Sequence, residues 1–132
     1  MPEIVVASAC CCGITCRWHG RPTRKSKAIR ELEKSGVQVW PVCPEMLGGL
    51  PCPRPPVKSK GGRIFETDPE TRTEIGREIT HIFTAGAILA KQVAVQVGAE
   101  RAFMMKMSPS CAPNGIAGRI FREAGIEVVP IW

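Results

Sequence analysis

Seven cysteines are the residues best suited to chemistry in this sequence, because a thiolate is both a nucleophile and a soft metal ligand. An odd number of thiols cannot all pair in disulfides, and consecutive cysteines bridge each other only with strain. Residues 1–6 lack the basic and long apolar regions of a signal peptide, so we expect a cytoplasmic, reducing environment. Clustered free thiols there more often bind metal or perform chemistry than cross-link the fold. The seven are Cys10, Cys11, Cys12, Cys16, Cys43, Cys52 and Cys111.

Three of these cysteines follow segments that are predicted to be strands. Cys10 comes after the apolar residues 4–7, Cys43 directly after residues 37–42, and Cys111 after residues 101–107. Because the carboxyl ends of parallel strands meet at one edge of a sheet, these thiols can converge. Three soft ligands favour zinc, copper(I) or an iron–sulfur cluster. The alternative is that each cysteine is a small buried hydrophobic residue, and no pair of Cys-x-x-Cys motifs indicates structural zinc.

Two polar residues accompany these thiols. Glu45 lies two residues after Cys43, and Ser108 lies three residues before Cys111. A carboxyl group beside a metal site in a dry crevice can act as a general acid or base. The alternatives are structural: Glu45 as a loop cap or a partner of an arginine such as Arg17 or Arg54, and Ser108 as a cap or turn residue.

The elements that must position these residues alternate between strands and helices. Residues 23–35, with Thr23 as a possible N-cap, 80–97 and 117–124 are predicted helices, and residues 126–131 are a closing strand. The proline-rich residues 43–60 are predicted to be a loop, residues 63–65 a small strand, and Asp68 the N-cap of a short helix. We therefore expect an α/β fold over residues 1–132 as a single domain. Its mostly parallel sheet would be flanked by helices on both faces, as in a Rossmann-like three-layer arrangement.

The net charge of +6 comes almost entirely from one segment, because residues 17–34 carry +5. Such a segment can attract nucleic acid or another anion, or it can be a solvated helix face. No zinc-finger spacing, RNP motif or basic–aromatic ladder supports a nucleic-acid partner. No apolar run is long enough to span a membrane, and no feature of the sequence indicates an oligomeric state.

Four motifs together resemble the thiouracil desulfurase family. They are Ser8-Ala9-Cys10 with Gly13 and Arg17, Cys43-Pro44-Glu45-Met46-Leu47-Gly48-Gly49-Leu50-Pro51-Cys52-Pro53-Arg54, Gly76-Arg77-Glu78-Ile79-Thr80, and Lys106-Met107-Ser108-Pro109-Ser110-Cys111. The resemblance implies a [4Fe-4S] cluster that is held by Cys10, Cys43 and Cys111, with its fourth iron open to a non-protein ligand. It also implies catalytic roles for Glu45 and Ser108.

The reaction that the resemblance implies is hydrolytic removal of sulfur from a thiolated pyrimidine base or a related thioamide, without net redox change. The sequence departs from the family pattern at Cys11-Cys12-Gly13, where Leu-Leu-Gly is usual, and at Arg17-Trp18-His19-Gly20, where Arg-Tyr-Asp-Gly is usual. Ala112 replaces a glycine, and the C-terminal third is shortened. These departures lie near the expected substrate pocket. The alternative function is a non-catalytic iron–sulfur or metal-binding module.

Overall fold

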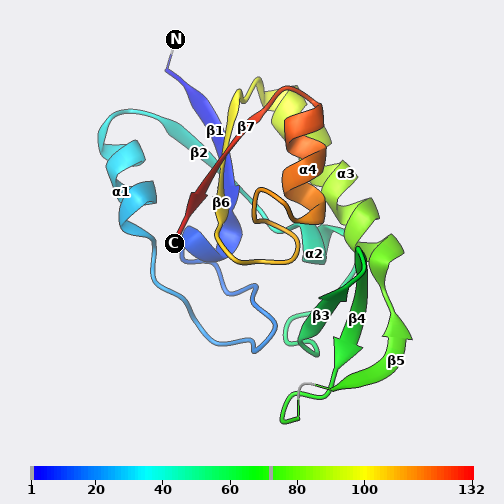
Figure 1. Ribbon diagram of the computed structural model, residues 1–132. Helices are drawn as coiled ribbons and strands as arrows, with labels where there is room; N and C mark the ends of the chain where they lie inside the picture. The colour runs from blue at the N-terminus through cyan, green and yellow to red at the C-terminus, as the bar shows by residue number, and fades with distance from the viewer. Residues whose placement is uncertain (1, 72) are drawn as a thin grey trace.

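The computed structural model describes residues 2–71 and 73–132. A four-stranded sheet forms its centre, as Figure 1 shows. The strand order is β2-β1-β6-β7. β1 covers Ile4–Ser8, β2 covers Gln38–Val42, β6 covers Arg101–Met105 and β7 covers Glu127–Ile131, and neighbouring strands are parallel. The predicted α/β fold with a mostly parallel sheet is therefore confirmed. The carboxyl ends of its strands all lie at the same edge.

Helices cover both faces of this sheet. α1 (Lys27–Lys34) packs on one face, and α3 (Thr80–Val97) and α4 (Ile116–Glu123) pack on the other (Figure 1). The bounds of α3 are those that the helical spacing of its apolar residues predicts. In the described part of the chain, no helix is both long and apolar enough to cross a membrane.

The side chains of β1 alternate between two hydrophobic cores, as the two-residue period of a strand requires. Val5 packs in the core that contains Ile29 of α1, whereas Val6 packs in the core that contains Phe83 of α3 and Phe121 of α4. All of these side chains are essentially buried. Burying each one stabilises the fold by roughly 1.5–3 kcal/mol, so both helical layers hold β1 at the centre.

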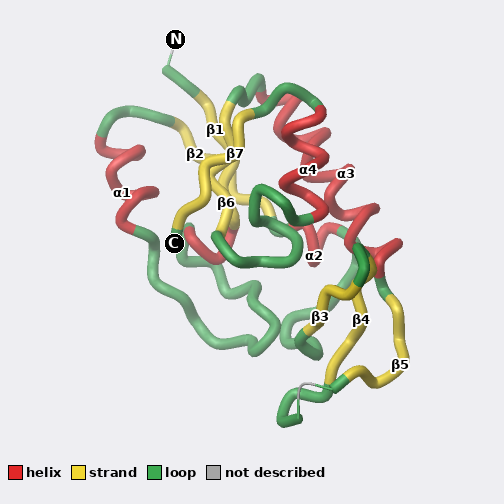
Figure 2. The backbone as a smooth tube through the Cα atoms, viewed as in Figure 1, coloured by secondary structure: helices red, strands yellow, loops and turns green. Residues whose placement is uncertain are grey.

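A second, antiparallel sheet follows the proline-rich segment. β3 (Val57–Lys60), β4 (Arg63–Thr67) and β5 (Glu74–Glu78) pair in sequence order (Figure 2). The prediction that residues 43–60 are all loop is wrong in part, because they contain β3 and the short helix α2 (Pro44–Leu47). A proline is tolerated in the first turn of a helix, and β3 begins only after the last proline of the segment.

Two predicted helix starts are also wrong. The helix expected from residue 23 begins at Lys27, because the Thr23 hydroxyl donates to the carbonyl of Cys10 at 2.8 Å instead of capping a helix. Asp68 starts a turn and not a helix. Its Oδ1 accepts the backbone N–H groups of Glu70 and Thr71 at 2.9 and 3.0 Å. Residue 72 lies outside the described residues.

Two helical glycines allow neighbouring segments of the chain to pack directly against the helix backbone. A Cβ atom at Gly86 of α3 would lie 1.7 Å from the carbonyl oxygen of Pro44 in α2. A Cβ atom at Gly118 of α4 would lie 2.0 Å from the carbonyl oxygen of Ala112, next to Cys111. Only glycine permits such approaches. The segments that carry Cys43 and Cys111 therefore rest on α3 and α4.

Candidate active site

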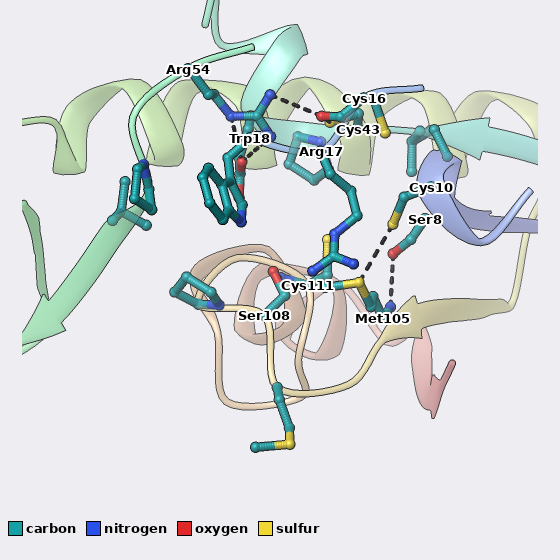
Figure 3. A pocket seen from close by; sticks show the side chains of 18 of the residues that line it. Ser8, Cys10, Cys16, Arg17, Trp18, Cys43, Arg54, Met105, Ser108 and Cys111 are labelled. Atoms are coloured by element: carbon teal, nitrogen blue, oxygen red, sulfur yellow. Dashed lines mark hydrogen bonds and ion pairs between the residues drawn. The ribbon is translucent and has the colours of Figure 1, made fainter. Parts of the chain in front are cut away.

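A cavity of about 210 Å³ lies at the carboxyl ends of β1, β2 and β6 (Figure 3). Cys10 lies in the short 3₁₀ turn after β1, Cys43 directly after β2, and Cys111 in the loop between β6 and α4. Glu45 in α2 and Ser108 in the same loop as Cys111 also line the cavity. The structure thus brings all five residues that the sequence singled out to one place.

The ends of β1 and β6 are tied together beside Cys10. The Ser8 hydroxyl oxygen accepts the backbone N–H of Met105 at 2.8 Å and points to the sulfur of Met104 at 3.8 Å. The Cys10 sulfur lies 3.5 Å from the sulfur of Met105 (Figure 3). The Cys10 thiol is therefore fixed at the boundary between two adjacent strands, in a soft, sulfur-rich environment.

Glu45 forms a buried ion pair with Arg54. The Arg54 Nε donates to Glu45 Oε2 at 2.9 Å, and Nη2 donates to the same oxygen. The side chains of Arg54 and Glu45 are only 6% and 16% exposed. Of the two arginines that the sequence offered as partners, the structure selects Arg54. Since both bonds use Oε2, Arg54 leaves the other carboxylate oxygen of Glu45 unengaged.

Ser108 organises the loop that carries Cys111. Its buried hydroxyl oxygen accepts the backbone N–H groups of Ser110 at 3.2 Å and Cys111 at 3.1 Å. Both acceptor positions of the hydroxyl are thereby used, which leaves its single O–H as a donor. The turn role that the sequence left open is therefore present, and it is compatible with a hydrogen bond from Ser108 to a bound molecule.

The loop between β6 and Ser108 contains a strained residue. Met107 is 91% exposed, lines the cavity and has a φ of 63°, in the left-handed region that non-glycine residues rarely adopt. Such strain costs of order 1–3 kcal/mol and tends to occur at functional sites. It marks the point where the chain turns from β6 into the site.

The thiols differ in their readiness to ionise. The pKa of Cys10 is lowered, chiefly by the thiols of Cys11 and Cys16, and that of Cys43 is lowered chiefly by Cys16. The same contacts raise the pKa of Cys16. Burial raises the pKa of Cys111 to about 12. Because metal coordination deprotonates a thiol outright, a bound metal group would supply the charge that Cys111 needs for ionisation.

The donor set fits a polynuclear iron–sulfur group. Cys10, Cys43 and Cys111 come from three separate segments and border one cavity. In the described chain, no three His, Cys, Asp or Glu side chains surround a single point as ligands of one metal ion would. The ligands of a cluster lie apart, because each thiolate binds a different iron, and thiolates are the usual ligands of such clusters.

Further residues line the cavity, and of these the sequence had named only Arg17 and Arg54, as possible partners of Glu45. They lie in irregular segments that have no periodicity to reveal their orientation. The backbone N–H of Arg54 donates to the Trp18 carbonyl at 2.7 Å, and its Nη1 donates to the Cys16 carbonyl at 2.9 Å. The available signal was a basic residue within two positions of a cysteine in both segments, Arg17 after Cys16 and Arg54 after Cys52. These further residues include Cys16, Arg17, Trp18 and Arg54.

Much of the basic segment borders a second cavity, of about 540 Å³. Two of its lysines pair with acidic residues of α1: Lys25 with Glu33 at 2.8 Å and Lys27 with Glu31 at 3.9 Å. Arg17 lines both cavities. A nucleic-acid partner for this segment stays a prediction. The basic residues of the second cavity are Arg17, Arg21, Arg24, Lys25, Lys27 and Arg30.

Three comparisons with known proteins agree with this picture. The sequence model of a family described as 2-thiouracil desulfurase matches residues 5–129. The "Uncharacterized protein YbbK" of Bacillus subtilis (strain 168) is 27% identical over 146 residues, which cover 96% of this chain and 94% of that protein. The solved structure of the [4Fe-4S]-dependent thiouracil desulfidase TudS is similar, with a TM-score of 0.82 and 29% identity, over 97% of this chain and 90% of that one.

Proposed function

Because the chain belongs to the 2-thiouracil desulfurase family, we propose that it removes sulfur from a thiolated pyrimidine base or a related thioamide. Water replaces the C=S group by C=O, and the sulfur leaves as sulfide with the two protons of water, so no electrons are exchanged. The observation that carries this proposal is the convergence of three thiols, Glu45 and Ser108 on one cavity.

The three thiols of Cys10, Cys43 and Cys111 would hold a [4Fe-4S] cluster, as the similarity to TudS supports. When bound, the cluster would supply an iron without a protein thiolate, a Lewis acid with affinity for soft sulfur. The protein contributes the shape of the cavity and the separation of the three ligands.

Glu45 is the group that would handle the proton of water. Its carboxylate lines the cavity with one oxygen held by Arg54, so the other can accept a proton from the attacking water and pass it on. The guanidinium fixes the orientation of the carboxylate, which matters because proton transfer requires hydrogen-bond distance. Arg54 is therefore a positioning residue for Glu45.

Ser108 would orient the ring of the substrate. Both of its acceptor positions are taken by backbone N–H groups, so its O–H is the remaining hydrogen-bonding group. It can donate to a ring nitrogen or oxygen of a bound base. Because the hydroxyl is buried and fixed by its own loop, this bond has one defined direction.

The cluster assignment is tested by anaerobic reconstitution, followed by iron and sulfide analysis and an absorption spectrum. Replacing Cys10, Cys43 or Cys111 by Ala should abolish the cluster. Cys12→Ala is the matched control, because Cys12 follows the same strand but does not line the cavity. Unchanged iron content in the three variants would show that the ligands are elsewhere.

The catalytic assignment is tested by release of sulfide from 2-thiouracil. Glu45→Gln should retain its iron and lose most of the rate, since positioned acid–base groups typically contribute about 10²–10⁴-fold. Retention of the full rate would remove Glu45 from the reaction. A reconstituted protein that holds iron but releases no sulfide would instead support the non-catalytic iron–sulfur module.

A further inference from the structure

Three consecutive backbone carbonyls fix the segment that carries Arg17. The Cys16 carbonyl accepts Arg54 Nη1 at 2.9 Å, and the Trp18 carbonyl accepts the Arg54 backbone N–H at 2.7 Å. Between them, the Arg17 carbonyl accepts the Cys52 thiol at 3.2 Å and the backbone N–H of Gly20 at 3.0 Å. The backbone of Arg17 is therefore held on both sides by tertiary contacts.

The guanidinium of Arg17, in contrast, is not occupied. Among the described residues, none forms a hydrogen bond or an ion pair with it. The side chain lines the cavity and extends toward the loop of Ser108 and Cys111 (Figure 3). Arg54, the other guanidinium of the cavity, is committed to Glu45. A fixed backbone with an unpaired, half-buried cation at its tip is the arrangement expected of a ligand-binding residue.

We propose that Arg17 is a substrate-recognition residue whose guanidinium binds a carbonyl oxygen of the same ring that carries the C=S bond to be cleaved. This inference rests on the proposed function and refines its substrate class. The preferred substrates are thioamides whose ring also carries a carbonyl oxygen, as that of 2-thiouracil does, and not simple thiones.

The chemistry of the guanidinium supports this assignment. It presents up to five N–H donors in a rigid fork and no acceptor, so it recognises oxygen atoms and not ring N–H groups. A hydrogen bond to a charged donor contributes roughly 10- to 100-fold in affinity at such a site.

The decisive experiment compares two substrates in two proteins. Arg17→Met should lower kcat/KM for 2-thiouracil by roughly 10- to 100-fold. It should change kcat/KM for pyrimidine-2-thione, which lacks the ring carbonyl, by less than about threefold. Arg17→Lys should recover part of the loss with 2-thiouracil. Arg30→Met is the matched control, since Arg30 lines only the second cavity.

A binding measurement keeps the inference testable without turnover. Calorimetry on the cluster-loaded protein should show that Arg17→Met weakens uracil roughly 10- to 100-fold and leaves 2-hydroxypyrimidine unchanged. An equal loss of affinity for both ring types, or a loss of iron in Arg17→Met, would show that Arg17 balances the charge of the cluster or supports folding. Either result would overturn the inference. No loss for either would also overturn it. Failure of the proposed function would appear differently, as absence of sulfide release in the unmodified protein.

Discussion

Replacing Arg54 by Met tests how the site is held together. The substitution removes the guanidinium that donates twice to Glu45 Oε2 and once to each of two backbone carbonyls, those of Cys16 at 2.9 Å and Pro51 at 3.2 Å. Met has a similar length and fills much of the space. The principal effect is therefore electrostatic, because Glu45 is left as a nearly buried carboxylate without its partner.

The magnitude follows from burial. Removing one partner of a buried ion pair costs about 3–5 kcal/mol. We expect a loss at the lower end of this range, about 3 kcal/mol. The Glu45 side chain is 16% exposed and can therefore be partly hydrated. In the double variant Arg54→Met/Glu45→Gln, the unpaired charge is gone, so part of the loss should return. The exposed pair Lys25–Glu33, with side chains 42% and 45% exposed, provides the control: Lys25→Met should cost at most about 1 kcal/mol.

The assay is the thermal midpoint of the cluster-loaded protein under argon. For a chain of this length, 1 kcal/mol corresponds to about 3–4 °C, so Arg54→Met should lower the midpoint by about 10 °C and Lys25→Met by at most about 4 °C. Equal shifts for the two single variants would refute the view that Glu45 and Arg54 form a desolvated pair. A double variant as unstable as the sum of its singles would refute it as well.

Three other outcomes follow from the structure. Gly86→Ala should destabilise the protein by about 1–3 kcal/mol and lower the amount of iron it retains, because the new Cβ collides with the Pro44 carbonyl. Thermal midpoints and iron analysis check this. Ala85→Ser, on the exposed side of α3, is the control. Without metal, the protein should lose stability between pH 9 and about 12, since Cys111 keeps its proton in the fold while the unfolded chain releases it from about pH 9. Urea unfolding of the metal-free protein at pH 8 and pH 10 should show this loss, and Cys111→Ala should reduce it. Joint replacement of Arg21, Arg24 and Arg30 by Gln should leave sulfide release from 2-thiouracil unchanged, because these residues line only the second cavity.

The parts of the fold that follow a simple period could be predicted from the sequence. The apolar residues of α3 recur at helical spacing, and the β-branched run after Glu3 forms β1. The meeting of Cys10, Cys43 and Cys111 at one edge followed from strand order alone, because it depends on topology and not on loop detail.

The remaining features depend on contacts between distant segments. β3 has mostly exposed side chains, so no buried face reveals it in the sequence. The helix predicted from Thr23 begins at Lys27, because the Thr23 hydroxyl donates to the Cys10 carbonyl. The bonds from Arg54 to residues 16 and 18 join segments without any repeat. Such pairings arise only when the chain is folded, so single-sequence reasoning does not reach them.

Two of the proposed ligand segments pack against glycines of α3 and α4, so metal affinity depends on how this helical layer packs. The segment of Cys43 touches α3 at Gly86, and the segment of Cys111 touches α4 at Gly118. A metal group that joins these thiols to Cys10, in the turn after β1, would fasten that layer to the sheet. Metal binding and the packing of α3 and α4 on the sheet are therefore thermodynamically linked. Metal binding would stabilise the packed position of the two helices by the same free energy by which that packing strengthens metal binding.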